Sequence, residues 1–308
     1  MSLSTKTKHW LEENAAISLH GKTAVVTGSN SGVGYKTAEV LLYLGADVIL
    51  ACRNPQRAND ACHTLAAEYP ESTIKTMTLD LADLSSIASF VEEIQNQHID
   101  IDVFVNNAGA IHHPGEKTKN GLDLVIGTNY FGVYDLTEKL MPYLTSLPHE
   151  VTYVNTISLI HKFAKLEYED FYCTKQKRNT MAVYGRSKLC LAKYSYYKAK
   201  ALEGSNVRLY MNHPGIAVTP LGINMVGPQL AKLAKSTMAF LFMPPEKSAL
   251  SVPFILANTF PVGTIVGPNK LLGGWGYPKV NRTLHKVTTG AEELIAFTDR
   301  EINLSRKP

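Results

Sequence analysis

The chain has 308 residues, 45% of them hydrophobic and 19% charged, so it can bury a sizeable core and is short enough to form one domain. A formal net charge of +4, with basic residues scattered along the sequence, argues against a nucleic-acid-binding surface. The four cysteines show neither CxxC spacing nor the density of a disulfide scaffold, and no metal site is indicated.

The first twenty residues do not have the composition of a signal peptide. Lysines and glutamates interrupt the apolar residues of 1–20, so the stretch lacks an apolar core. Apolar runs elsewhere, such as 238–243, are far too short to span a bilayer. With the cysteine pattern, these features predict a cytoplasmic protein without a membrane span.

Residues 22–44 read as a strand, a glycine-rich turn and a helix. In such a turn the first glycine allows a tight bend, the second lets the backbone approach a pyrophosphate, and the third permits close helix packing. Free amides at the helix start face the negative charge. The turn therefore predicts dinucleotide binding. The candidate cofactor-binding residues here are Gly28, Asn30, Ser31, Gly32, Val33 and Gly34.

The next predicted strand, 46–51, ends at a position that bears on cofactor choice. In NAD-binding proteins an acidic residue about 20 residues beyond the first glycines holds a ribose hydroxyl. Here the strand runs into Cys52 and Arg53, and no carboxylate stands there. A guanidinium can pair with the 2′-phosphate of NADP, so we predict NADP as the preferred cofactor, with NAD as the alternative. Arg53 as a solvated loop charge is the other interpretation.

Strands and helices continue to alternate, with helices expected over 55–68 and 84–97 and strands over 73–79 and 101–105. This βαβ rhythm predicts a doubly wound parallel sheet with helices on both faces, a three-layer α/β/α Rossmann fold. Ligands of such sheets bind at the carboxyl ends of the strands, so residues that follow the strands are candidate cofactor contacts, with turn formation alone as the alternative. These residues are Asp80, Leu81, Asn107 and Gly109.

A long helix is expected over 121–144, and it contains Asn129. Asparagine is a poor residue for a helix interior because its side chain competes for backbone hydrogen bonds. A local kink that holds a water would explain it. The strand that follows, 151–157, places Ser158 at its carboxyl end, although serines commonly end strands.

The stretch Tyr184-Gly-Arg-Ser-Lys188 opens a predicted helix that runs to about residue 203. A tyrosine and a lysine four residues apart lie on one helix face. A positive charge within about 4 to 6 Å typically lowers the pKa of a phenol by about 1 to 3 units. Tyr184 is therefore a candidate general acid or base. A surface lysine beside a core tyrosine is the alternative, because such pairs are common.

Two connections flank this helix. The polar stretch between Ser158 and Tyr184 reads as a surface excursion beside the site. On the other side, a strand over 206–211 leads into the sequence His-Pro214-Gly, whose proline and glycine force a fixed turn. Pro214 and, five residues further, Thr219 are candidate cofactor contacts.

The histidines do not indicate a metal site. We interpret His213 as packed at a strand end. His112 and His113 are adjacent, without a carboxylate or further ligand at suitable spacing, so they are candidates for the rim of a pocket.

The C-terminal part begins with an apolar stretch, about 216–245, rich in Leu, Met, Ala and Phe. It is either a lid over a substrate cleft or an ordinary pair of core-facing helices. Because the sequence contains no internal repeat or linker, we predict one domain over 1–308 with a C-terminal tail from about 267 to 308. After the apolar stretch we expect a helix over 246–257, a last strand over 263–266, a glycine-rich segment over 267–279 and a final helix near 291–302.

In order along the chain, these features resemble the motifs of the short-chain dehydrogenases/reductases, and the resemblance extends from Lys22 to about Lys279. The glycine spacing is similar to that of the single-domain branch. The segments 51–54, 158–162 and 184–189 resemble the retinol-dehydrogenase-like group. The motifs that carry the family resemblance are Thr27-Gly-Ser-Asn-Ser-Gly-Val-Gly34, Asp80-Leu81, Asn106-Asn-Ala-Gly109, Asn129, Ser158, Tyr184-x-x-x-Lys188 and Pro214-Gly215 with Thr219.

The resemblance implies an oxidoreductase that interconverts a carbonyl and an alcohol on an apolar small molecule, with a tetrad of Asn129, Ser158, Tyr184 and Lys188. Tyr184 would transfer the proton while hydride passes to or from nicotinamide C4. Ser158 would bind the carbonyl oxygen, Lys188 would bind the nicotinamide ribose and lower the tyrosine pKa, and Asn129 would hold a water. Retinol as the substrate is not implied.

The resemblance also implies a homo-oligomer, a dimer or tetramer, formed through the helices that begin near Gly121 and Tyr184. The alternative is that tyrosines such as Tyr194 on the second helix pack internally. A rival function of another class is an inactive NAD(P)-binding sensor or scaffold. A further enzymatic alternative is an isomerase or dehydratase that uses bound cofactor without net oxidation.

Overall fold

The structure is a computed structural model that describes residues 2–112, 115–174, 180–216 and 243–306. Thr219, His113 and most of the stretch predicted as a lid lie outside the described residues. The strands are β1 Thr23–Thr27, β2 Asp47–Cys52, β3 Ile74–Thr78, β4 Val103–Asn106, β5 Val151–Thr156, β6 Val207–Asn212, β7 Ile265–Lys270 and β8 Trp275–Asn281.

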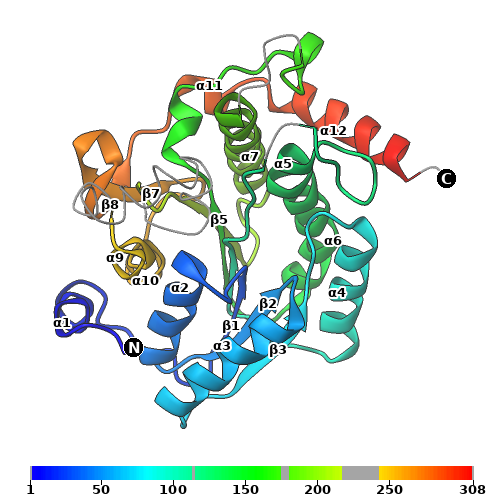
Figure 1. The fold of residues 1–308 in the computed structure, drawn as a ribbon. Helices are drawn as coiled ribbons and strands as arrows, with labels where there is room; N and C mark the ends of the chain where they lie inside the picture. Colours follow the sequence, from blue (N-terminus) through cyan, green and yellow to red (C-terminus); the bar gives the residue numbers. More distant parts are fainter. Residues whose placement is uncertain (1, 113–114, 175–179, 217–242, 307–308) are drawn as a thin grey trace, which may run out of the picture.

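The described strands form one eight-stranded sheet in the order β3-β2-β1-β4-β5-β6-β7-β8 (Figure 1). Neighbouring strands from β3 to β7 pair in parallel, and β8 is antiparallel to β7. The chain moves outward from β1 in one direction and from β4 in the other, which is the order of a doubly wound fold. The predicted Rossmann-type sheet is confirmed.

Helices cover both faces of the sheet, with α2 and α10 on one side and α4, α6 and α7 on the other (Figure 1). The α-helices are α1 Thr5–Asn14, α2 Gly32–Tyr43, α3 Pro55–Glu68, α4 Leu84–Asn96, α5 Leu124–Ile126, α6 Gly132–Ser146, α7 Thr180–Ala201, α9 Pro245–Ala249, α10 Ser251–Leu256, α11 His285–Thr288 and α12 Ala291–Ser305. The shorter elements are the π-helix Gly127–Phe131 and the 3₁₀ turns Leu159–Lys162, Tyr168–Asp170 and Leu271–Gly273.

Alternate residues of the central strands fill two separate cores. In β1, Val25 packs into the core beneath α4, α6 and α7, whereas Ala24 and Val26 pack into the core beneath α2, α3 and α10. All three side chains are fully buried. Parallel strands covered on both faces need apolar residues at every position, which is why β1 and β2 read as continuous apolar runs.

Two features of the C-terminal and N-terminal regions differ from the expectation. The glycine-rich segment 267–279 forms most of the β7–β8 hairpin, not an irregular tail, and Gly276 has a positive φ of 120° with no room for a Cβ beside Asn269. The glycines there serve close packing at the sheet edge. The helix α1 was not expected, because its stability comes from distant partners: Trp10 stacks on Tyr277 of β8 at 5.6 Å between ring centroids.

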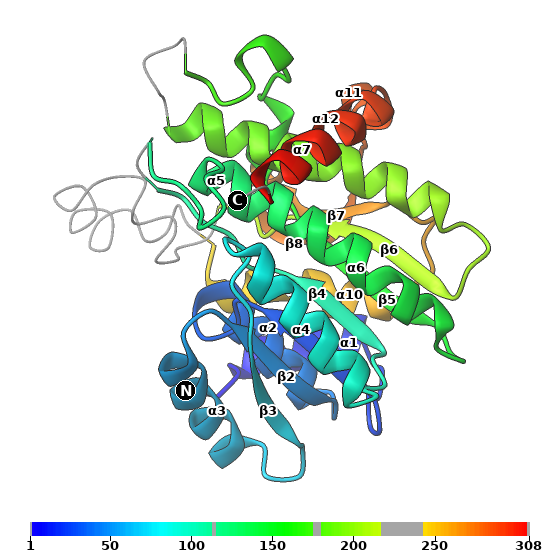
Figure 2. The same ribbon diagram turned by 90° about the vertical axis from the view of Figure 1, so that its right-hand side faces the viewer.

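The C-terminal helix α12 lies over α7 and the start of α6 (Figure 2). The hydroxyls of Tyr130 and Thr298 are 2.7 Å apart, and the hydroxyl of Tyr134 donates to Asp299 at 2.6 Å. Phe297 packs on Phe171 with ring centroids 4.4 Å apart. Helix α12 therefore covers part of the surface of α6 and α7.

Within the described ranges, no helix combines the length and the apolar character that crossing a membrane requires.

Candidate active site

The first feature of the site joins the turn after β1 to the segment after β4. The hydroxyl of Thr27 accepts hydrogen bonds from the amides of Asn107 at 3.0 Å and Ala108 at 2.9 Å, and the Asn107 side-chain amide donates to the Thr27 carbonyl at 3.0 Å. The carboxyl ends of β1 and β4 are thereby fixed to each other. Asn107 thus steadies the neighbouring strand.

Two glycines of the turn have no space for a side chain. Gly28 adopts a φ of 65°, and a Cβ there would lie 2.9 Å from Cα of Ala108. A Cβ on Gly34 would lie 2.3 Å from Nδ2 of Asn107 and 2.4 Å from the carbonyl oxygen of Gly28. Ser31 precedes α2 without a side-chain capping bond to it. The first amides of α2, which have no partner within the helix, are therefore not satisfied by this cap.

Three predicted cofactor contacts follow β2 and β3. Arg53 is exposed and comes directly after β2. Asp80 is partly buried after β3, where its carboxylate accepts the amide of Ala82 at 3.0 Å, so it shapes the turn. Leu81 is buried, and its carbonyl oxygen would lie 2.1 Å from a Cβ on Gly132.

Asn129 lies in the π-helix between α5 and α6, fully buried. Its Oδ1 accepts the amide of Ala110 at 2.6 Å, and its Nδ2 donates to the Ala110 carbonyl at 2.8 Å. π-helical turns are rare and often mark functional sites. The predicted irregularity of this helix is confirmed at Asn129, whereas the water that we expected there stays a prediction.

Gly109 stands between Asn129 and Lys188. A Cβ on Gly109 would lie 3.2 Å from Oδ1 of Asn129 and 3.6 Å from Nζ of Lys188. Lys188 is 3% exposed and donates to the carbonyl of Thr156 at the end of β5, with Nζ and the oxygen 2.8 Å apart. Residues from β4, β5, the π-helix and α7 thus meet at the carboxyl edge of the sheet.

Tyr184 is 8% exposed, and its side chain hydrogen-bonds that of Ser158. Burial raises the pKa of Tyr184, and the bond with Ser158 opposes this only in part. The prediction that Lys188 lowers the pKa of Tyr184 was wrong for the protein without cofactor. Burial disfavours the charged form of Lys188 as well and lowers its pKa to about 8.

Ser187 is a member of the cluster that the sequence did not single out. It is fully buried, its hydroxyl donates to the Tyr184 carbonyl at 2.7 Å, and it accepts from Nδ2 of Asn129 at 3.2 Å. It thereby ties the π-helix to α7. Its position between Tyr184 and Lys188 was the only available signal.

The turn after β6 packs against the β7–β8 hairpin. Gly215 has a φ of 73°, and a Cβ there would lie 2.7 Å from the carbonyl oxygen of Gly274. Pro214 beside it is partly buried. His213 is fully buried against Gly267, and burial lowers its pKa to about 3. The interpretation of His213 as a packed histidine is confirmed.

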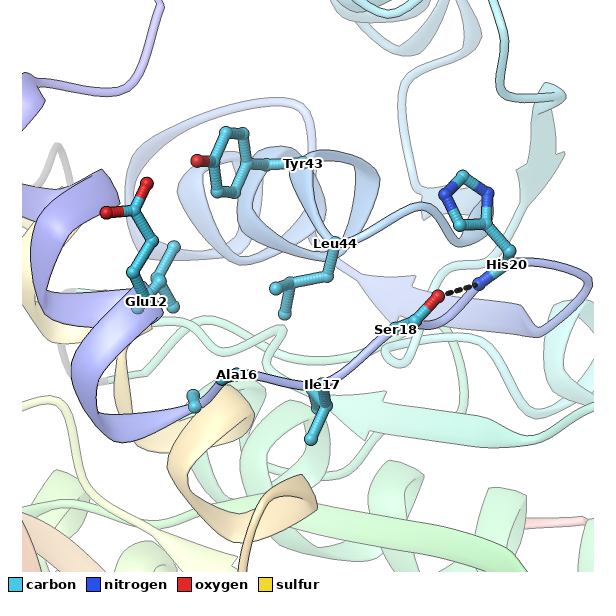
Figure 3. A pocket seen from close by; sticks show the side chains of 9 residues that line it. Glu12, Ala16, Ile17, Ser18, His20, Tyr43 and Leu44 are labelled. Atoms are coloured by element: carbon cyan, nitrogen blue, oxygen red, sulfur yellow. Dashed lines mark hydrogen bonds between the residues drawn. The ribbon is translucent and has the colours of Figure 1, made fainter.

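A separate hollow of about 390 Å³ lies between α1, the connection to β1 and the end of α2 (Figure 3). Glu12, Ser18 and Tyr43 are among the residues that line it. The end of α2 leads into the amino end of β2, so this hollow lies at the sheet edge opposite the cluster around Lys188. It belongs to no part of the predicted site.

The sheet order, the glycine turn at the start of α2 and the buried Tyr184–Lys188 pair define a nucleotide-binding α/β oxidoreductase. The sequence profile described as "short chain dehydrogenase" matches residues 22–227. The chain belongs to the short-chain dehydrogenase family.

Individual relatives agree with this assignment. Retinol dehydrogenase 14 of Mus musculus is 36% identical over 235 residues, covering 73% of this chain and 70% of the relative. Retinol dehydrogenase 14 of Homo sapiens is 33% identical over 263 residues, covering 81% and 77%. A crystal structure of an uncharacterised protein from Mycobacterium paratuberculosis superimposes with a TM-score of 0.74 at 26% identity, covering 96% of this chain and 97% of that one. The protein is an enzyme, an NAD(P)-dependent oxidoreductase of the class that acts on CH–OH groups.

Proposed function

We propose that the enzyme interconverts a carbonyl and an alcohol on an apolar small molecule, with NADP as its cofactor and Tyr184 as the general acid or base. The observation that supports this most is the meeting of Asn129, Lys188 and Gly109 beside the Tyr184–Ser158 pair, at the edge of the sheet that holds the glycine turn.

The residues of the glycine turn fit a dinucleotide. Gly28 and Gly34 let the turn pack closely on Ala108 and Asn107, which holds the start of α2 at the carboxyl end of β1. Ser31 makes no side-chain capping bond to α2, so the first amides of the helix can bind a pyrophosphate. Asn30, Ser31, Gly32 and Val33 belong to the same turn. When bound, the nicotinamide would supply or accept the hydride at C4.

The protein's own groups would then handle the proton. Ser158 would hold the substrate oxygen beside the Tyr184 hydroxyl, to which it already hydrogen-bonds. Lys188 would bind the ribose hydroxyls of the cofactor, and Asn129 would keep a water in contact with Lys188. Burial raises the pKa of Tyr184 and so favours its protonated form, which can donate the proton to a carbonyl oxygen.

We propose NADP over NAD because of Arg53. It stands exposed after β2, at the place where NAD-binding proteins carry an acid, and a guanidinium suits a 2′-phosphate. Arg53→Ala should weaken NADPH binding far more than NADH binding, as fluorescence titration of both cofactors would measure. An unchanged ratio of the two dissociation constants would remove Arg53 as the selector.

Turnover tests the role of Tyr184. General acid–base catalysis contributes about 10²- to 10⁴-fold, so Tyr184→Phe should lose that factor in kcat while it retains NADPH binding. The rate is followed at the NADPH absorbance band over a panel of apolar aldehydes, ketones and alcohols. The panel includes retinal and retinol, because relatives carry the name retinol dehydrogenase. Equal rates for Tyr184→Phe and the wild type would refute the assignment.

The same panel separates the rival functions. An inactive sensor or scaffold would bind NADPH and turn over no compound, whereas an isomerase would convert substrate without a change in NADPH absorbance. The filled positions Ser158, Tyr184 and Lys188 favour the active enzyme.

The oligomeric state, the cytoplasmic location and the extent of the domain stay predictions. In the structure Tyr194 is fully buried and its hydroxyl donates to Glu138 at 2.6 Å. That contact supports internal packing for this tyrosine. Light scattering coupled to size-exclusion chromatography would measure the mass of the particle.

A further inference from the structure

The segment between Ser158 and α7 is a packed part of the fold. We call residues 159–171 the excursion lobe; it contains the 3₁₀ turns Leu159–Lys162 and Tyr168–Asp170. The sequence suggested a polar surface excursion. In the structure Phe171 is 2% exposed and packs against Phe131 as well as Phe297, so the lobe has a buried anchor.

Arg186 holds the lobe by its main chain. Its guanidinium donates to the carbonyls of Lys165 at 2.9 Å and Phe171 at 3.1 Å, and also to that of Asp170. A further bond of 3.3 Å reaches the carboxylate of Glu167. The Arg186 side chain itself is almost fully buried, at 7% exposure. Four bonds from one planar group fix both ends of the stretch 165–171, and no other residue type offers that geometry.

A second basic side chain holds the first half of the lobe. Nζ of Lys286 in α11 donates to the carbonyls of Lys162 at 2.7 Å and Ala164 at 2.8 Å. Lys193 of α7 donates in turn to the carbonyls of Lys286 and Thr289, which keeps α11 against α7. The lobe is therefore attached to α7 directly through Arg186 and indirectly through α11.

The lobe begins directly after Ser158, the residue that faces Tyr184. The carbonyl of Ser158 accepts the amide of His161 at 3.1 Å and lies 2.6 Å from Nδ1 of the same histidine, so Ser158 is held by the first turn of the lobe. That turn packs closely on α7: a Cβ on Gly185 would lie 3.2 Å from Cγ1 of Ile160. Any drift of the lobe along α7 is therefore transmitted to Ser158.

We propose that Arg186 is a positioning residue that sets the separation of Ser158 and Tyr184 by clamping the excursion lobe to the helix that carries Tyr184. The proposal rests on the proposed function for its kinetic consequence. In this proposal the three residues between Tyr184 and Lys188 act without contacting the substrate. Gly185 leaves space for the lobe to pack on α7, Arg186 binds the lobe, and Ser187 joins the π-helix to α7.

The first test measures the lobe itself. Hydrogen exchange of the amides of His161, Phe163 and Cys173, which donate to carbonyls within or beside the lobe, is compared in wild type, Arg186→Met and Arg208→Met. Arg208 is the matched control, because it also pairs with a glutamate, Glu150 at 3.0 Å, but at the amino end of β6. Only Arg186→Met should accelerate exchange of these amides, by about tenfold or more, while α4 exchanges as in the wild type.

The second test measures catalysis. A displacement of about 1 Å in a reacting group can cost about 10²-fold, so kcat/KM of Arg186→Met should fall about 10- to 100-fold, mostly in kcat. The dissociation constant for NADPH should stay within about twofold, because the glycine turn lies on β1 and α2. Arg186→Lys keeps the charge and fewer of the bonds, so it should recover part of both the exchange protection and kcat.

The outcomes are distinct. Unchanged exchange of the lobe in Arg186→Met overturns the clamp, whatever the rates. Faster exchange with kcat/KM within twofold of the wild type overturns the positioning role and leaves a structural one. If Arg186→Met does not fold, Lys286→Met and Arg186→Lys are measured against the same expectations. If the wild type reduces nothing in the panel, the proposed function fails, while the exchange data still decide whether Arg186 holds the lobe.

Discussion

The buried ammonium of Lys188 allows a quantitative prediction. Burial lowers its pKa to about 8 from the ordinary 10.5, which means that the folded protein carries this charge at a cost. At about 1.36 kcal/mol per pKa unit the cost is at most ~3.4 kcal/mol. It is fully present below pH 8, where both folded and unfolded chains are protonated. It fades as the pH rises from 8 toward 10.5, because the folded chain sheds the proton first.

The variant Lys188→Met should therefore be more stable than the wild type at pH 7. The gain is reduced by about 1 kcal/mol, independently of pH, because the carbonyl of Thr156 loses its partner. From the two pKa values, the difference in unfolding free energy between variant and wild type should fall by about 2 kcal/mol between pH 7 and pH 9.5.

Urea unfolding followed by tryptophan fluorescence measures this difference at each pH. The two tryptophans, Trp10 and Trp275, lie in α1 and β8, away from the substitution. Lys200→Met is the control on the same helix: Lys200 is 44% exposed and pairs with Glu203, so its effect should vary by less than about 0.5 kcal/mol over that range. A difference for Lys188→Met that is equally flat would show that its pKa is not lowered.

Two further substitutions test the packing of the site. Gly34→Ala places a methyl group 2.3 Å from Nδ2 of Asn107, so the glycine turn must shift; we expect a loss of about 1 to 3 kcal/mol in stability and at least tenfold weaker NADPH binding. Wild-type values in thermal melts and titration would contradict the close packing. Ser187→Ala removes the link between Asn129 and Tyr184 and should cost about 1 kcal/mol and lower kcat. A wild-type kcat at full NADPH saturation would contradict the link.

The positions of most elements could be predicted because residues close together in the sequence determine them. The apolar runs of β1 and β2 and the glycine turn between them fix the first βαβ unit, and α3 begins and ends at the expected residues, Pro55 and Glu68. Asn129 indicated the irregular part of its helix, because an asparagine side chain competes for backbone hydrogen bonds and is unfavourable in a regular helix interior.

The parts that escaped prediction depend on contacts between distant residues. Arg186 reads as an ordinary helix residue until its guanidinium meets carbonyls 15 to 21 positions earlier in the chain. The antiparallel β8 escaped because it lies in a glycine-rich segment that reads as a loop, while its partner strand supplies the hydrogen bonds. The pKa of Tyr184 was misjudged because spacing along a helix predicts which charges are neighbours, whereas burial is a property of the whole fold.

Helix α12 contacts the residue next to Asn129. Tyr130 follows Asn129 directly, and its hydroxyl meets Thr298 of α12. A protease cut that loosens α12 would therefore act directly on the π-helix, because Tyr130 belongs to it. Helix α12, although it contributes no predicted site residue, thus supports the turn that holds Asn129.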